Sequence, residues 1–190
     1  MATIDSAAPH FELIQHLDQA VTSDDGKVCC GKVKTVLEDL CRSGKPILSD
    51  HDMRPAPDRY ARHLVHLDPE GRYSVLAMVW DKGQGTAIHD HAGMWCCECV
   101  YRGKIKVVSY EMEGDDDAGP VQFHAQETIM AGPGEAGALI PPFDHHTIEN
   151  ALDEPSVTIH VYGGEMTWCH VFVPTENGYE KVYRELAYTP

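Results

Sequence analysis

The segment GQGTAIHDHAGMWCCECVYRG, from Gly83 to Gly103, carries the residues that decide the fold and the chemistry of this chain. Its two histidines, His89 and His91, stand two positions apart, and on a β-strand such alternate side chains share a face. Neutral imidazole suits zinc, copper, iron and nickel, so the pair provides half of a metal site. The glycines before the pair allow a close bend. A solvated polar loop is the other interpretation, because the chain contains 12 histidines.

The composition is that of one soluble globular domain. The 190 residues suffice for one sizeable core and argue against a second domain. Hydrophobic residues make up 43% of the chain and charged residues 24%, which are ordinary values. The net charge of -15 excludes nucleic acid as the expected partner, because phosphates attract Lys and Arg. No segment approaches the ~18 apolar residues of a membrane span, so no membrane partner is expected.

The cysteines and the N-terminus indicate a reducing compartment. The N-terminal sequence MATIDSAAPHFELIQ has neither the basic region nor the apolar core of a signal peptide. Seven cysteines without an export signal are typical of reduced thiols rather than of a disulfide framework. The chain also lacks the paired CxxC arrays of structural zinc sites. We therefore expect a cytoplasmic protein.

The first third of the chain is predicted to be helical and the rest to consist of strands. Apolar residues recur with helical spacing in PHFELIQHLDQAV (9–21) and GKVKTVLEDLCRS (31–43), and Pro57-Asp58 would start a short third helix. Short β-rich segments separated by Gly, Pro and Asp predict strands at 72–81, 94–101, 104–112, 121–130, 145–151, 156–163 and 167–173. This order predicts a small β-barrel or sandwich with an α-helical N-terminal cover.

The spacing G-x5-H-x-H-x4-C-x6-G between Gly83 and Gly103 resembles the first motif of the cupin β-barrels. In that motif a Glu ligand stands at the position of Cys96. The resemblance implies a mainly β, cupin-type jelly-roll barrel. It also implies one domain over the whole chain, with a mainly helical cover at 1–66, a barrel core at 67–175 and a C-terminal extension at 176–190.

A second segment resembles the other cupin motif, P-x-G-x2-H-x3-N. It matches at Pro141, His146 and Asn150, while Phe143 replaces the glycine. The match selects His146 over His145 as the third metal ligand. The residues alone leave this choice open, because neighbours on a strand face opposite ways and only one can face the metal.

Three histidines without a carboxylate leave the charge of a divalent metal to be balanced by the substrate. A thiolate would balance it, since the thiolate is the metal-binding form of a thiol. The same ligands also suit zinc with a bound water, which is a hydrolytic site. The ligand types do not choose between these chemistries, and the usual order of affinities favours copper and zinc over iron.

Four separated segments together resemble the thiol dioxygenases, and the cysteine dioxygenase family in particular. Cys96 in place of Glu, with three histidines, is the pattern of that family. The segment YARHLV (60–65) is similar to its Tyr-x-Arg substrate-binding segment, and SVTIHVYGG (156–164) is similar to its Ser-x-His-x-Tyr segment. CHVF (169–172) follows at the expected spacing. The similarity covers roughly residues 55 to 173.

The strand predicted at 156–163 places Thr158, His160 and Tyr162 on one face, alternating with apolar residues. Polar groups on a buried face need partners, so we expect these three to hydrogen-bond to one another. A structural network would give the same pattern. The resemblance implies that the network is catalytic and faces the metal, and that Cys96 and Tyr162 can join in a thioether cross-link. Because both strands face inward, we expect this pair to meet across the barrel. Without this resemblance, Cys96 would be interpreted as a buried, inert cysteine.

The resemblance implies an Fe(II)-dependent dioxygenase that inserts both atoms of O2 into the sulfur of L-cysteine to give cysteine sulfinate. His89, His91 and His146 would hold the iron, and Arg62 with Tyr60 would bind the substrate carboxylate. We expect a monomer. Two alternatives stay open: a dioxygenase of 3-mercaptopropionate or mercaptosuccinate, and a metal-binding cupin without activity. Arg62 favours cysteine over 3-mercaptopropionate, whose enzymes commonly carry Gln there.

Overall fold

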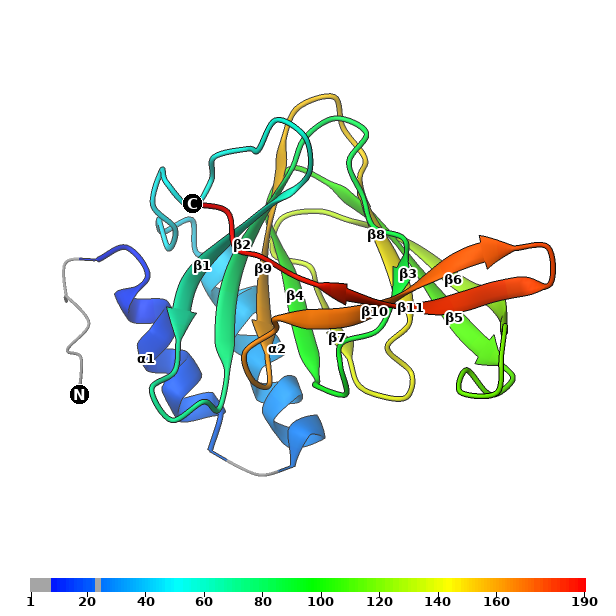
Figure 1. Cartoon of the computed structure of the whole chain (residues 1–190). Coiled ribbons are helices and arrows are strands. Elements are labelled where there is room, and N and C mark those ends of the chain that lie inside the picture. The colour runs from blue at the N-terminus through cyan, green and yellow to red at the C-terminus, as the bar shows by residue number, and fades with distance from the viewer. Residues whose placement is uncertain (1–7, 23–24) are drawn as a thin grey trace.

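The computed structural model of the protein describes residues 8–22 and 25–190, in which two helices precede eleven strands (Figure 1). The helices are α1 (Phe11–Ala20) and α2 (Gly26–Arg42). The strands are β1 (Ala61–Leu67), β2 (Ser74–Trp80), β3 (Ile88–His89), β4 (Cys96–Arg102), β5 (Ile105–Glu113), β6 (Gln122–Ala131), β7 (Ala136–Leu139), β8 (His146–Asn150), β9 (Ser156–Tyr162), β10 (Trp168–Thr175) and β11 (Gly178–Glu185). The N-terminal sequence was predicted to contain no signal peptide. Its first seven residues, 1–7, lie outside the described part.

The strands form two antiparallel sheets. One has five strands in the order β1-β2-β9-β4-β7, and the other has six in the order β11-β10-β3-β8-β5-β6. Their inner faces share a core that includes Leu76, Trp80 and Ile148. The expected fold class is therefore confirmed: a mainly β, cupin-type jelly roll with an α-helical N-terminal segment. The two sheets remain separate and do not close edge to edge.

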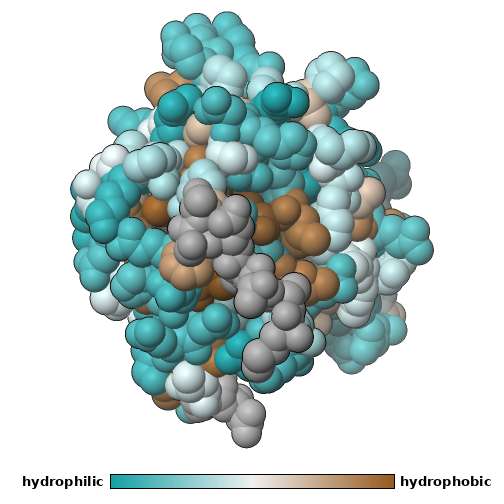
Figure 2. Space-filling model, turned by 90° about the vertical axis from the view of Figure 1, so that its left-hand side faces the viewer, coloured by the Kyte–Doolittle hydropathy of each residue, from teal (hydrophilic) through white to brown (hydrophobic). Residues whose placement is uncertain are grey.

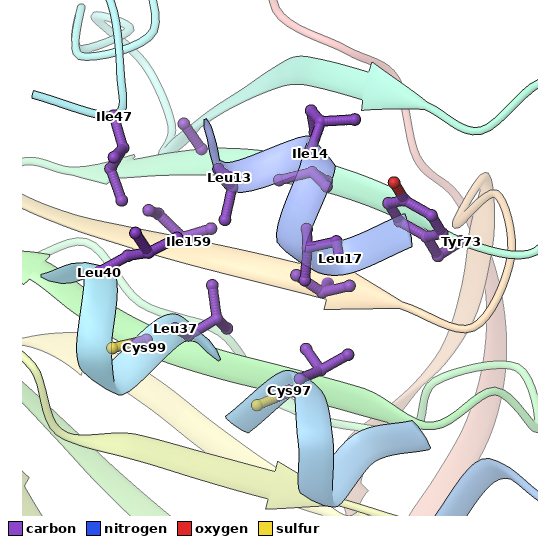
Figure 3. Close-up of a cluster of buried hydrophobic side chains, with 14 of the residues drawn as sticks. Leu13, Ile14, Leu17, Leu37, Leu40, Ile47, Tyr73, Cys97, Cys99 and Ile159 are labelled. Atoms are coloured by element: carbon purple, nitrogen blue, oxygen red, sulfur yellow. The ribbon is translucent and has the colours of Figure 1, made fainter. Parts of the chain in front are cut away.

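The two helices cover the outer face of the five-stranded sheet (Figure 3). Leu13 and Leu17 of α1 and Leu37 of α2 are fully buried there, together with Ile159 of β9. The surface on this side of the molecule is hydrophilic around its edge, while hydrophobic residues gather in its middle (Figure 2). No helix in the described part has the length and apolar character needed to cross a membrane.

Helix α2 begins earlier than the periodicity predicted. The Asp25 carboxylate caps it by accepting hydrogen bonds from the backbone N–H groups of Lys27 and Val28, at 2.9 and 3.2 Å. The added turn carries the buried thiols Cys29 and Cys30. Because cysteine packs as a small apolar residue, these two extend the buried stripe of the helix toward its N-terminus.

The third helix predicted at Pro57-Asp58 is wrong. The chain forms β1 from Ala61, inside the span expected to be a helical cover, and pairs with β2 from Ala61 to Leu67. The Pro-Asp pair favours the start of a helix only locally. Pairing with the fully buried strand β2 instead provides hydrogen-bond partners for the backbone along the whole of β1. At the other end, β11 pairs with β10 along its whole length, so strand structure also extends past residue 175.

Strand β4 sends its side chains alternately to two cores. Cys97 and Cys99 pack in the helix-facing core (Figure 3), together with Cys30 and Cys41 of α2. Cys96 packs between the sheets with Tyr162. We therefore interpret Cys97 and Cys99, which match nothing in the cupin motifs, as packing residues.

Gly103 makes the tight turn between β4 and β5. Its φ is +84°, and a Cβ there would lie 2.9 Å from the Ser156 Cα. A side chain would therefore be strained and would clash with β9. This requirement explains the glycine that closes the quoted segment.

Candidate metal centre

Three histidines converge between the two sheets. His89 ends β3, His91 lies in the turn that follows, and His146 begins β8. The pairing of β3 with β8 sets His89 directly opposite His146. One ring nitrogen from each histidine lies within 4.8 Å of the other two. The structure thus brings together the three side chains that the two motifs single out.

Hydrogen bonds leave the same ring nitrogen free on all three histidines. The Nδ1 atoms of His89, His91 and His146 bond to the Ala87 carbonyl at 3.1 Å, the Asp144 carboxylate at 2.9 Å and the Asp144 carbonyl at 3.1 Å. These oxygens only accept, so each Nδ1 carries the proton and each Nε2 offers a lone pair. Burial lowers the pKa of His89 and His91 and favours their neutral, metal-binding form. Three such donors suit a first-row divalent metal.

Asp144 orients the triad and was not singled out from the sequence. Its carboxylate accepts hydrogen bonds from both the backbone N–H and the ring of His91, at 3.1 and 2.9 Å. Burial alone would raise the pKa of Asp144, but His91 lowers it below its ordinary value. Acceptors of this kind fix the tautomer and orientation of a metal-binding histidine. The only signal in the sequence is an acidic residue two positions before His146.

His145 lies apart from the triad. Its ring centroid is 5.3 Å from that of Phe123 and 5.2 Å from that of Phe172, so it packs in an aromatic cluster. Adjacent residues entering β8 face opposite ways, as the alternation of a strand requires.

The three polar residues of β9 form a hydrogen-bonded row. Thr158 Oγ1 lies 2.7 Å from His160 Nε2, and the Tyr162 hydroxyl lies 3.4 Å from His160 Nδ1. The indole N–H of Trp80 donates to Thr158 Oγ1 at 2.8 Å and so fixes the far end of the row. Burial lowers the pKa of His160 to about 4 and raises that of Tyr162. Both groups are therefore neutral near pH 7.

Cys96 and Tyr162 are neighbours within one sheet. They stand opposite each other in the register of β4 and β9, and both pack in the core between the sheets. The expectation that they meet across the barrel is therefore corrected, because β4 and β9 pair directly. Burial raises the pKa of the Cys96 thiol well above its usual range, so this sulfur is protonated.

Arg62 is buried but pairs with no carboxylate among the described residues. Its guanidinium donates to the carbonyls of Met166 at 2.9 Å and Ala187 at 3.3 Å, and lies 5.6 Å from the centre of the Tyr188 ring. Tyr60 stacks on Trp80 with ring centroids 4.6 Å apart. Two carbonyl contacts leave part of the five-donor fork of the arginine free for a ligand.

A cavity of about 100 Å³ joins these groups. It is lined by the three histidines, Arg62, Tyr162 and Arg184 of β11. Arg184 could not be placed from the sequence, because β11 was not predicted. The cavity is small, so it suits a ligand of few atoms with an anionic group directed at the arginines.

Glu98 is a further buried charge beside the triad, and it too was overlooked. Its Oε2 lies 3.7 Å from His146 Nε2 and 3.6 Å from His160 Nδ1. Burial alone would raise its pKa, but the attraction of these histidines holds it at about 2. In return, Glu98 raises the pKa of His146, which burial alone would lower. The alternation of side chains along β4 could have identified Glu98 as inward-facing, because it stands two residues after Cys96, which faces inward.

The family model for cysteine dioxygenase type I matches residues 51–174 of this chain. The chain belongs to that family. The matched span contains all three histidines and Arg62. Cysteine dioxygenase type 1 from Rattus norvegicus and from Homo sapiens are each 25% identical to the chain over 115 residues, which is 60% of the chain and 56% of each relative. The match thus spans about half the length of these curated relatives.

Two solved structures also resemble the chain. A Cupin 2 conserved barrel domain protein from Salinispora arenicola has a TM-score of 0.42 and 17% identity, over 60% of this chain and 83% of that one. A double-stranded beta-helix protein from Klebsiella pneumoniae has a TM-score of 0.45 and 20% identity, over 63% of this chain and 91% of that one.

Proposed function

We propose that this protein is an Fe(II)-dependent thiol dioxygenase that inserts both atoms of O2 into the sulfur of L-cysteine, giving cysteine sulfinate. One observation carries the proposal most directly. Three histidine Nε2 donors share a small cavity with Arg62, a buried cation that pairs with no acidic side chain of the described residues. When bound, the iron would supply thiolate coordination and oxygen activation.

Arg62 would bind and orient the substrate carboxylate. A buried cation without a counter-ion is unfavourable, so a carboxylate that enters the cavity is attracted strongly. The planar fork favours a bidentate pair, which fixes the substrate in one orientation. Tyr60 lines the same cavity, and burial raises the pKa of its hydroxyl, so it stays protonated and able to donate.

The row formed by Thr158, His160 and Tyr162 would position a proton at the Tyr162 oxygen. Trp80 already donates to Thr158, so the Thr158 hydroxyl can in turn donate to His160 Nε2. The proton on His160 then sits on Nδ1, the nitrogen facing the phenol. The phenol itself keeps its proton, because burial raises its pKa, and can donate it to substrate or oxygen in the cavity.

A second candidate substrate is a thiol with two carboxylates, such as mercaptosuccinate. Arg184 lines the same cavity and forms no ion pair with the described residues, so two arginines face one small space. Arg184→Gln separates the candidates. A loss of activity confined to mercaptosuccinate would favour the dicarboxylate, whereas an equal effect on both thiols would remove Arg184 from substrate recognition.

The deciding experiment is a substrate panel. Iron-loaded protein is mixed with L-cysteine, 3-mercaptopropionate, mercaptosuccinate and cysteamine, while oxygen uptake and sulfinate formation are measured. We expect sulfinate in a one-to-one ratio with oxygen, and the highest kcat/KM with L-cysteine. Oxygen uptake with none of the thiols would reduce the protein to a metal-binding cupin without activity.

A further inference from the structure

Asp90 stands between His89 and His91 in the sequence, and the proposed function gives it no role. Its side chain does not line the cavity of the triad and instead meets His170 of β10. Asp90 Oδ2 accepts a hydrogen bond from His170 Nδ1 at 2.7 Å, and Oδ1 accepts one from the His170 backbone N–H at 2.8 Å. The Asp90 backbone N–H donates to the His170 carbonyl at 3.1 Å. These three bonds fasten the segment between the two histidines to β10.

Strand β3 alone gives this segment little support. It has two residues, each of which pairs with one residue of β10. The regular ladder therefore ends at His89, whereas His91, the next proposed ligand, lies two residues beyond it. The bonds between Asp90 and His170 continue the attachment to β10 past the end of the ladder.

The turn that follows His91 is strained, and Asp90 holds this turn as well. The Met94 N–H donates to the His91 carbonyl at 2.9 Å, so the turn closes over Ala92 and Gly93. Their φ angles are +53° and +77°, a left-handed conformation that suits glycine but is unfavourable for alanine. Asp90 Oδ1 accepts a hydrogen bond from the Ala92 N–H at 3.1 Å. Because a strained residue persists only where its surroundings determine its conformation, this bond helps to keep Ala92 in place.

His170 is itself held by its neighbours. Its ring packs edge-on against Trp168 of β10 and Tyr183 of β11, with ring centroids 5.2 and 6.5 Å away. The side chains of Asp90 and His170 are 19% and 26% exposed, so the bond between them is largely shielded from water. His170 belongs to the segment CHVF (169–172), whose spacing was singled out in the sequence but which the proposed function does not use.

We propose that Asp90 and His170 are positioning residues of the metal centre. Together they fix the turn that carries His91, and so set where His91 Nε2 lies relative to His89 Nε2. Asp144 orients the ring of His91, whereas Asp90 fixes the backbone before and after it. Oxygen atoms that accept hydrogen bonds suffice for this role, so it does not depend on the charge of Asp90. The inference rests on the metal site of the proposed function but is independent of substrate and reaction.

A purely structural role is the competing account. In that case the contacts between Asp90 and His170 only stabilise the fold, and their loss lowers the melting temperature without changing the metal affinity of the folded protein. The positioning role predicts a weaker affinity and an altered geometry at the metal. The two accounts therefore differ in the metal-binding properties of variants that remain folded.

The test is the affinity of full-length Asp90→Ala for Co(II), measured by competition with a chelator at a temperature where circular dichroism shows the variant to be folded. We expect the dissociation constant to rise by about 10- to 100-fold, the usual effect of losing a residue that orients a metal ligand. The visible absorption bands of the bound Co(II), which depend on coordination geometry, should shift. Asp90→Asn should restore both the affinity and the spectrum, because its amide oxygen still accepts hydrogen bonds from the two backbone N–H groups.

Two further variants complete the test. His170→Phe keeps an aromatic ring beside Trp168 and removes only the bond to Asp90 Oδ2, so we expect a smaller rise in the dissociation constant and a smaller spectral shift. Thr175→Ala is the matched control. It removes a side-chain bond to a backbone N–H two residues further on, that of Asn177, at the far end of the hairpin of β10 and β11. Its affinity and spectrum should equal those of the unmodified protein.

The outcomes separate the inference from the proposed function. An unchanged dissociation constant and spectrum in Asp90→Ala, whatever its melting temperature, would overturn the inference. If Asp90→Ala does not fold, the same result in His170→Phe would overturn it. A loss in Asp90→Asn as large as that in Asp90→Ala would also overturn it, because the hydrogen bonds would then not be what matters. Absence of metal binding in the unmodified protein would instead refute the metal site itself.

Discussion

At the scale of single residues, the choice between His145 and His146 is the sharpest test of the site. We expect His89→Ala, His91→Ala and His146→Ala to lose tightly bound metal, because each removes one of three converging Nε2 donors. His145→Ala should keep its metal and lose stability only, since that ring packs on Phe123 and Phe172. Elemental analysis after desalting measures both. Metal retained by His146→Ala but lost from His145→Ala would reverse the assignment.

The contact between Cys96 and Tyr162 leads to a second prediction at this scale. Opposed residues of paired strands have Cβ atoms about 4.5–5.5 Å apart, close enough for Sγ to reach a ring carbon. Formation of the C–S bond removes the thiol hydrogen and one ring hydrogen, with two electrons passing to O2. Intact-protein mass of the iron-loaded protein after turnover should therefore show a fraction lighter by two hydrogen atoms.

Two serine variants control this measurement. Cys96→Ser should abolish the lighter fraction, because the bonding sulfur is gone. Cys97→Ser should preserve it, because Cys97 packs in the helix-facing core. A lighter fraction that persists in Cys96→Ser, or that disappears in Cys97→Ser, would assign the bond to another pair.

At the scale of secondary structure, Asp68 joins the β1–β2 turn to α1. Its carboxylate accepts two hydrogen bonds from the Arg72 side chain, at 2.8 Å each, and Arg72 also bonds to Asp18 of α1. The hydrogen bond from Arg72 lowers the pKa of Asp68. We expect Asp68→Asn to reduce the free energy of unfolding at pH 7 by about 1.5–3 kcal/mol, the usual range for a charged hydrogen bond.

The sign of the pKa shift fixes the pH dependence of this effect. A carboxyl whose pKa is lower in the folded state stabilises the protein fully above its ordinary pKa of about 4. That stabilisation is lost as the pH falls through the lower, folded value. The free energies of unfolding of the unmodified protein and of Asp68→Asn in urea should thus begin to converge below about pH 4, and meet only below the folded pKa. Glu70→Gln is the control: Glu70 also lies near Arg72 but is 74% exposed, so its loss should change stability little. A difference that is constant with pH would contradict this account.

The strands that the sequence predicted are those with long β-rich segments. The segment 72–81 contains β2 and the segment 156–163 contains β9, both central and fully buried. The strands it missed depend on their neighbours. For example, β3 has two residues and is defined by pairing with β8 and β10. Such a strand has no periodicity to detect. The residues of β11 are mostly exposed, so the strand has no buried face to detect, and it forms by pairing with β10.

The same distinction applies to the site. His89 and His91 could be singled out because their spacing is itself a motif. Asp144 and Arg184 could not, because a lone acid or base in the sequence is usually a solvated surface group. They become part of the site only when β8 and β11 bring them to it. Glu98 is intermediate, since the alternation of β4 implied its inward direction.

At the scale of the whole molecule, the site exists only where the two sheets face each other. The histidines of the triad come from β3, β8 and the turn after β3, which belong to the six-stranded sheet. The row on β9, the thiol of Cys96 and the guanidinium of Arg62 come from the five-stranded sheet. Under the proposed function, the three histidines that would hold the metal and Arg62, which would bind the substrate carboxylate, come from different sheets, so a change near Arg62 should affect substrate binding without removing a metal ligand.

The C-terminal segment after β11 allows this division to be tested. It leaves the six-stranded sheet and returns to β1 (Figure 1), where the Thr189 N–H donates to the Arg62 carbonyl at 2.8 Å. The Arg62 backbone N–H donates to Thr189 Oγ1 at 2.9 Å, and the Ala187 carbonyl accepts from the guanidinium. Removing residues 186–190 should therefore leave the Arg62 side chain with only the Met166 carbonyl as a partner, while the three histidines stay in place.

We expect the truncated protein to retain its iron but to lose about tenfold or more in kcat/KM for L-cysteine, where a factor of ten corresponds to ~1.4 kcal/mol of transition-state binding. Cysteamine, which has no carboxylate, should lose much less. Tyr188→Phe is the control, because it keeps the ring beside Arg62 and removes only the hydrogen bond to Glu165. Metal content and both kinetic constants are measured on the same preparations. Equal losses on the two thiols would make the segment a general support of the fold, and loss of iron would show that the two sheets do not act independently.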